Sequence, residues 1–372
     1  MTFMIVTIIV FILILSVLVL IHEAGHFFVA KKMGVKVEEF GFGFPPRIYG
    51  KKIGETVYSL NALPIGGFVK LYGEDEAGMG KVSLKKSKEK YKDAKRAFFA
   101  KNPWQRALIV VAGVIMNFLL AVIIASYLFA VVGISVPGNH VLVAEVAKNS
   151  PAEKAGLMVG DTIISVNSIK ITNPEQLISY TKQHLGEKIS MVVLDKQHTQ
   201  HTLSITPRVK YPANEGAMGV AITSDVIAKK YPWYQAPVVG TVETVKQSWL
   251  VIQGLGQAVW QLVAQRSVPK DIAGPIGIAE LTGQFVQIGP NAVLSLVSLL
   301  SLNLAVLNIL PIPALDGGRL FFILIEAITG KKVNPKYEGY AHAVGMAFLL
   351  MLIFLITFHD IVRLITHQPL IP

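Results

Sequence analysis

The sequence predicts a polytopic α-helical membrane protein with four transmembrane helices, a membrane-associated β-hairpin and an inserted β-rich domain. Of its 372 residues, 52% are hydrophobic and only 16% are charged, and the mean hydropathy is +0.52. Soluble domains carry about one quarter charged residues. A helix needs about 20 apolar residues to cross a bilayer, and four runs approach or exceed this length: residues 2–30, 107–132, 292–312 and 341–358. We therefore expect four membrane crossings.

The charges between these runs predict their orientation. The first run is interpreted as an anchor and not as a signal peptide, because no Lys or Arg precedes it and no small-residue cleavage pattern closes it. Residues 31–106 hold 17 Lys and Arg against 8 Asp and Glu, whereas residues 135–290 hold 13 against 11. Basic loops tend to stay in the cytoplasm. We expect the N-terminus and residues 135–290 to lie outside and the basic loop inside.

The basic loop contains an apolar, glycine-rich stretch between Glu38 and Gly73 that reads as hairpin strands. Non-helical backbone enters a membrane only where protein or a water-filled cavity satisfies its polar groups. The stretch is either a re-entrant hairpin or a solvent-exposed one. The basic cluster from Lys81 to Lys101 is interpreted as a contact with anionic membrane lipids and not with nucleic acid, because aromatic residues are sparse there.

The long segment between the second and third spans has two parts. The sequence from Ser150 to Ile171, SPAEKAGLMVGDTIISVNSIKI, looks like a PDZ domain, with a helix expected near 174–185. Such domains bind a peptide by adding it as a strand to a sheet edge; a β-rich spacer is the alternative. We expect His198 and His201 to be surface residues. Beyond it, Val242 to Val263 has helical periodicity and predicts an amphipathic helix at the outer membrane surface.

The segment HEAGH, at residues 22–26, lies inside the first apolar run. Ionisable groups at membrane depth are costly, so they are usually paired, ligated or facing a cavity. Residues four apart share a helix face, so His22 and His26 can bind one metal ion while Glu23 reaches a metal-bound water. The chain has no cysteine, which excludes thiolate ligands. Zn²⁺ suits this chemistry best, although residue type alone leaves Fe²⁺, Mn²⁺ and Co²⁺ open.

A catalytic zinc usually has three protein ligands, so one more is required. Asp316, in NILPIPALDGGRL, is the best candidate because Pro311 and Pro313 break the third span just before it. Glu326 and Asp360 are the alternatives and are expected near helix ends.

The depth of the candidate ligands in the membrane follows from nearby lysines. His22 lies ten residues before Lys32, which is about 15 Å along a helix. Asp316 lies similarly close to the cytoplasmic Lys331 and Lys332. Both candidate ligands are therefore expected in the cytoplasmic half of the membrane.

At these residues the chain resembles the intramembrane site-2 proteases, and within them the bacterial RseP/RasP-type enzymes. The similarity covers nearly the whole length, with HEAGH, GFGFPP, PIGGFVKLYGE, the PDZ-like insert, GPIGI and NILPIPALDGG in order. It implies a zinc endopeptidase of the bacterial plasma (inner) membrane. Its expected partners are single-pass transmembrane substrates, such as anti-sigma factors or signal-peptide remnants, which it would cut by Glu-assisted attack of zinc-bound water.

The resemblance also implies residue roles. His22, His26 and Asp316 match the metal ligands of the family, and Glu23 matches its general base. Substrate-binding roles are implied for five further residues: Asn308, Asn303, Gly66, Gly67 and Phe68. Interhelical hydrogen bonding is the alternative for the two asparagines. The segment after the PDZ-like insert is too short for the second PDZ domain that many relatives of the RseP type carry.

These expectations divide the chain into eight parts. They are a first span with HEAGH (1–32), a cytoplasmic basic loop with the re-entrant hairpin (33–103), a second span (104–134), a PDZ domain (135–225), extracytoplasmic amphipathic and connecting helices (226–290), a third span leading into the LDG motif (291–314), a cytoplasmic loop (315–340) and a fourth span (341–366). Two alternatives remain: a metal-ion transporter, since intramembrane His and Asp also line ion paths, and a PDZ-bearing membrane scaffold. Loss of proteolysis but not of metal on Glu23→Gln would separate the protease from both.

Overall fold

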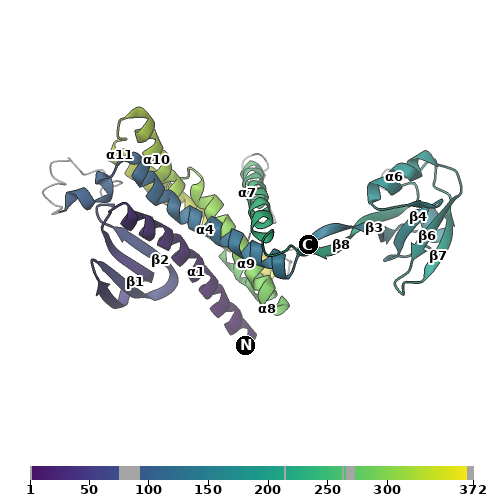
Figure 1. Cartoon of the computed structure of the whole chain (residues 1–372), viewed down its shortest axis with the longest axis horizontal. Helices are drawn as coiled ribbons and strands as arrows, with labels where there is room; N and C mark the ends of the chain where they lie inside the picture. Colours follow the sequence, from purple (N-terminus) through teal and green to yellow (C-terminus); the bar gives the residue numbers. More distant parts are fainter. Residues whose placement is uncertain (1, 75–92, 213–214, 262–263, 265–272, 367–372) are drawn as a thin grey trace. The chain divides into compact units, whose positions relative to one another are not determined.

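The computed structural model describes residues 2–74, 93–212, 215–261, 264 and 273–366 (Figure 1). The chain forms two compact units. One, called the membrane unit here, combines Met1–Ala130 with Pro232–Pro372; the other, the inserted unit, is Val131–Tyr231. Most of the basic cluster predicted at Lys81 to Lys101 lies outside the described residues.

Four helices of the membrane unit are long and apolar enough to cross a membrane, as predicted. They are α1 (Thr2–Lys32), α4 (Pro103–Val131), α9 (Pro290–Ile309) and α11 (Pro335–Ile365). The other helices of this unit are η1 (Ala94–Arg96), η2 (Phe98–Ala100), α7 (Ala236–Trp260), α8 (Pro275–Ile288) and α10 (Asp316–Thr329). Proline at the first helical position starts α4, α8, α9 and α11, where its missing N–H has no cost.

Helices α1 and α4 cross closely because small residues meet at the crossing. A Cβ atom on Gly25 of α1 would lie 2.4 Å from the carbonyl oxygen of Ala112 on α4. Small residues allow backbones to approach each other inside a membrane. Near the crossing, apolar side chains of both helices and of the adjoining elements form a core: Phe27, Ala30, Val35, Val37, Leu71, Phe98, Ala107, Ile109, Val110 and Ile323. The glycine thus sets how closely α1 and α4 pack.

Strands β1 (Val37–Ile53) and β2 (Thr56–Leu71) form the predicted antiparallel hairpin, and each is long enough to pair twice. The first half of β1 pairs on one side with residues 67–71 of β2 and on the other with residues 57–60. Residues 67–71, called the edge segment here, are thus at one edge of a sheet of four short segments. The second half of β2 lies along α1, where Ser16 donates a hydrogen bond to the Pro64 carbonyl at 3.0 Å. Contact with an apolar span favours the re-entrant alternative.

Helix α7 covers most of the predicted helix from Val242 to Val263, and it packs alongside two candidate spans; its position at the outer membrane surface remains a prediction. Gly240 lies against Ser126 of α4, where a Cβ atom would be 2.4 Å from the serine hydroxyl. Further along α7, Val251 and Leu255 pack on a buried cluster formed by α4 and α9: Ala121, Leu302 and Val306. Small residues early in α7 permit this approach, which periodicity alone did not reveal.

The inserted unit is a mainly antiparallel β-domain with a hydrophobic core. Its strands are β3 (Ile134–Val146), β4 (Thr162–Val166), β5 (Ile169–Lys170), β6 (Ile189–Leu194), β7 (Gln200–Ile205) and β8 (Val220–Lys229), and its helices are α5 (Pro151–Lys154) and α6 (Pro174–Gln183). The strand order is β7-β6-β4-β3-β8, and β5 pairs with β4. The expected β-rich domain and its helix are present. The assignment as a PDZ domain remains a prediction.

Candidate metal centre

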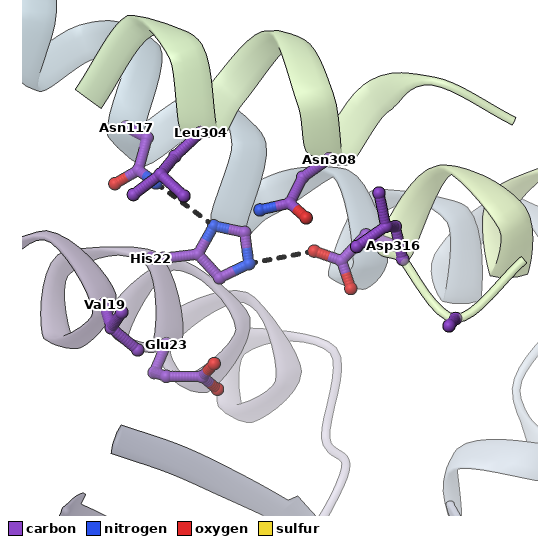
Figure 2. A pocket seen from close by; sticks show the side chains of 9 residues that line it. Val19, His22, Glu23, Asn117, Leu304, Asn308 and Asp316 are labelled. Carbon is purple, nitrogen blue, oxygen red and sulfur yellow. Dashed lines mark hydrogen bonds and ion pairs between the residues drawn. The ribbon is translucent and has the colours of Figure 1, made fainter. Parts of the chain in front are cut away.

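Helix α1 presents three polar side chains within one turn. His22 and His26 are four residues apart, and their Nε2 atoms are 3.1 Å from each other. Both histidines are buried, at 9% and 8% exposure. Helical geometry thus gathers the two imidazoles on one face, while Glu23 directly follows His22 in the same turn (Figure 2).

Asp316 lies next to the two histidines although it is 294 residues from His22 in the sequence. Its Oδ2 atom lies 2.9 Å from His22 Nε2 and 3.3 Å from His26 Nε2, and Figure 2 shows its carboxylate pointing at His22. The turn before α10 folds tightly onto the helix start, where a Cβ atom on Gly317 would lie 2.0 Å from the Leu310 carbonyl oxygen. Glycine is therefore required at this position to bring Asp316 to α1.

The three donor atoms fit a zinc ion. Zn²⁺ binds histidine nitrogen and carboxylate oxygen at about 2.0–2.2 Å in tetrahedral geometry, so neighbouring donors stand about 3.4 Å apart. The observed separations are 2.9, 3.1 and 3.3 Å. Two imidazoles and one carboxylate also form the three-ligand set of catalytic zinc sites, which keep one position open. Within the described ranges, no other group of three potential ligands comes as close together.

Second-sphere contacts orient both imidazoles. His26 Nδ1 lies 2.8 Å from the Ile109 carbonyl oxygen, to which it donates, and this leaves Nε2 free for a metal. His22 Nδ1 lies 3.4 Å from the side-chain amide of Asn117, whose Oδ1 atom is buried without a partner. Turning this amide over lets Oδ1 accept a bond from Nδ1–H. Both nitrogens that face the aspartate are then available as ligands.

Sequence reasoning missed the contributions of α4 to this centre. Asn117 is fully buried at 0% exposure, and Gly113, one turn earlier, leaves room for the histidines: a Cβ atom there would lie 2.4 Å from His26 Nε2. A single asparagine in an apolar span was the available signal. Interhelical packing decides which face of α4 meets α1. The apolar composition of α4 does not predict this face.

Two cavities adjoin the donor atoms, and Glu23 and Asp316 line both. The first, of about 210 Å³, lies between α1, α4, α9 and the turn before α10, and Asn308 lines it (Figure 2). The second, of about 320 Å³, lies beside the edge segment, and Gly67 and Phe68 line it. The Glu23 carboxylate accepts a hydrogen bond from the Val69 backbone N–H at 3.0 Å. Glu23 therefore adjoins open space in two cavities beside the donor atoms.

The remaining predicted residues fall outside these cavities. Asn303 lies on α9 and lines neither of the two cavities. Gly66 precedes the edge segment with φ of +83° and packs near Phe44. His201 pairs with Asp195 at 2.9 Å on the exposed surface of the inserted unit. Neither Asn303 nor Gly66 therefore lines the space beside the donor atoms, and their predicted contact with substrate remains a prediction.

The two alternative acidic ligands have other partners. Glu326, near the end of α10, pairs with buried Arg106 at 2.6 Å. Asp360, in the last turns of α11 and fully buried, accepts a hydrogen bond at 2.8 Å from the Gly277 N–H in the first turn of α8. Both lie near helix ends, as expected, and neither joins the histidines. Asp316 alone completes the donor set among the described acidic residues.

Comparison with known proteins agrees with this arrangement. Residues 10–352 match the profile of peptidase family M50. The chain belongs to peptidase family M50. The match includes the segments that carry His22, His26 and Asp316, so the three donor atoms lie within the family's own domain.

Individual relatives resemble this M50 peptidase over almost its whole length. The zinc metalloprotease RasP of Bacillus licheniformis is 32% identical over 431 aligned positions, covering 96% of this chain and 99% of that protein. The regulator of sigma-W protease RasP of Bacillus subtilis is 31% identical, covering 96% and 99%. A putative zinc metalloprotease of Clostridium acetobutylicum is 36% identical over 355 positions, covering 95% and 97%. The chain is a site-2-type zinc metalloprotease, with zinc as its cofactor.

Proposed function

We propose that this zinc metalloprotease cleaves the transmembrane segments of single-pass membrane proteins. The observation that carries the proposal is the position of Glu23: it lies in a candidate membrane span, beside a buried His–His–Asp donor set, and lines both adjoining cavities. A hydrolytic site at this depth suits a substrate that is itself in the membrane.

In this proposal His22, His26 and Asp316 hold the zinc, and Glu23 is the general base. When bound, zinc polarises the scissile carbonyl and acidifies water. Glu23 accepts the proton of the attacking water and returns it to the departing amine. Asn117 and the Ile109 carbonyl hold the imidazole rings in the required tautomers.

The edge segment gives a physical route for presenting the peptide bond. A helical peptide bond is shielded by its own hydrogen bonds, so a transmembrane substrate must unwind before hydrolysis. An extended chain can pair with a sheet edge through main-chain hydrogen bonds. We assign this role to the edge segment, with Gly67 and Phe68 beside the second cavity, and assign Asn308 to contact with the peptide from the first cavity. Asn303 and Gly66 line neither cavity, so we assign them no direct contact with the peptide.

The class of substrate follows from the relatives only as a proposal. One relative is named a regulator of sigma-W protease, which suggests anti-sigma factors as the single-pass substrates of this chain too. The charge distribution further supports an extracytoplasmic N-terminus and inserted unit. We propose that the inserted unit is a PDZ domain, whose edge strand β8 would accept a peptide.

The Glu23→Gln variant tests this function. We expect purified Glu23→Gln to keep about one zinc per chain and to lose cleavage of a single-span model substrate by at least about 1,000-fold, because glutamine cannot accept the proton. Zinc is measured by elemental mass spectrometry and cleavage by gel mobility. Asp316→Asn is the complementary variant and should lose zinc. Normal cleavage by Glu23→Gln would refute the assigned base, and metal-dependent transport by the wild type without cleavage would favour a transporter.

A further inference from the structure

An ion pair links the helix that carries Asp316 to the end of the edge segment. Arg319 lies one turn after Asp316 on α10, and its guanidinium contacts Glu74 Oε1. The other oxygen of Glu74, Oε2, accepts a hydrogen bond from the Leu71 backbone N–H at 3.3 Å. One carboxylate therefore joins α10 to the edge segment.

The two carboxylates that contact the edge segment bind alternate residues. Glu23 accepts from Val69 N–H and Glu74 accepts from Leu71 N–H. Because residues two apart in a strand point the same way, both amides belong to the outer edge, which pairs with no other strand among the described residues. An added peptide would need these same amides. Glu74 thus covers the edge at Leu71, one pairing step beyond the carboxylate assigned as the base.

The residues that make these contacts surround the second cavity. Glu23, Val69, Leu71, Glu74, Arg319 and Asp316 all line it. The Arg319 side chain is 40% exposed and the Glu74 side chain 19% exposed. The pair is placed to fix geometry between the metal-donor helix and the edge segment.

We propose that Arg319 and Glu74 are positioning residues that end the edge segment at Leu71 and hold it in register with the metal centre. This proposal rests on the proposed function, since it concerns the extended substrate. A pairing step along a strand is two residues. Loss of the ion pair would uncover the Leu71 amide and let the substrate pair one step further, so that its scissile bond no longer faces Glu23.

The test compares Arg319→Gln, Glu74→Gln, the double variant and Arg319→Lys in the full-length protein. We expect each glutamine variant to raise KM for the single-span substrate about tenfold with less change in kcat, and to yield a second product cut two residues away. The double variant should be no worse than either single variant, because the two residues act as a pair. Arg319→Lys should recover most of the loss. Zinc content should stay at the wild-type value.

Arg47→Gln is the matched control, because Arg47 pairs with Glu39 within the same sheet at 2.5 Å and does not reach α10. It should leave KM and the cleavage site unchanged. A single cut site with unchanged KM in Arg319→Gln would overturn the proposal, as would additive losses in the double variant.

A readout independent of cleavage separates this proposal from the proposed function. In backbone hydrogen exchange, Arg319→Gln should speed exchange of the peptide covering residues 67–74 at least about tenfold, while residues 56–61 exchange as in the wild type. If the wild-type protein cleaves no membrane substrate, the proposed function fails, yet this exchange still tests the link. Equal exchange in residues 67–74 of variant and wild type would overturn it.

Discussion

Replacing Gly113 by alanine is expected to weaken zinc binding, because the new methyl group would enter the space that the ligands occupy. Its Cβ would lie 2.4 Å from His26 Nε2 and 2.8 Å from His22 Cε1. Ordinary contacts begin at 3.4 Å, so the histidines or the helices must move by about 1 Å. Zinc sites hold their ligand distances within about 0.2 Å. The displacement therefore exceeds this tolerance several times.

Separation of the helices does not relieve this clash cheaply. Gly25 of α1 lies against the Ala112 carbonyl on α4 immediately beside the site, so retreat of α1 would break this close packing. We expect zinc affinity to fall by about 10- to 100-fold, the size seen when groups around metal ligands are changed. Affinity is measured by competition with a chelator in detergent, with zinc per chain as a second readout.

Gly254→Ala is the matched control for helix propensity. Gly254 lies on α7 with no atom within 4 Å of the added carbon, and alanine in an open helical position stabilises by up to about 1 kcal/mol. This variant should bind zinc as the wild type does. If Gly113→Ala matched the wild type within about twofold in zinc affinity, the histidine donors would not lie against α4 and the reasoning would be refuted.

Three further predictions concern other buried or paired groups. Asn117→Leu should lower zinc affinity about 10- to 100-fold by removing the partner of one imidazole, measured by the same competition; unchanged affinity would contradict the second-sphere role. Asp360→Ala should lower the free energy of unfolding by about 1–3 kcal/mol, since it leaves the first turn of α8 without its buried acceptor, and an unchanged Tm would contradict this. In the inserted unit, hydrogen bonds from His140 hold the pKa of Asp225 below its ordinary value. The resulting stabilisation is present above about pH 4 and is lost as pH falls through the lowered pKa, so His140→Ala should shift acid unfolding of this unit to higher pH; no shift in circular dichroism would count against it.

The sequence predicted the parts of the site that follow from local spacing. The separation of His22 and His26 is helical, and Asp316 stood out as an acidic residue after a proline-broken span, so the amino-acid sequence alone was enough to pair them. The four spans and the hairpin follow from composition in the same way. The paired residues form a donor set with separations of 2.9–3.3 Å.

What the sequence did not reveal depends on how the helices are rotated and packed against one another. Asn117 and Gly113 join the site because α4 turns that face toward α1, and an apolar helix does not show which of its faces is buried in protein. The packing of α7 against α4 likewise depends on close contact at Gly240. For Asn303, the third span could be predicted but not its orientation, and the residue lines neither cavity.

The donor set comes entirely from the membrane unit, from segments that precede and follow the inserted unit in the sequence. Buried contacts join the two halves of the membrane unit: Ser301 on α9 donates to the Asn117 carbonyl at 2.8 Å, and Ser298 donates to the Ala121 carbonyl at 3.0 Å. The metal centre is thus assembled between two sequence-distant halves of one unit, so a change that loosens the packing of α4 against α9 would be felt at the zinc ligands as directly as a change beside them.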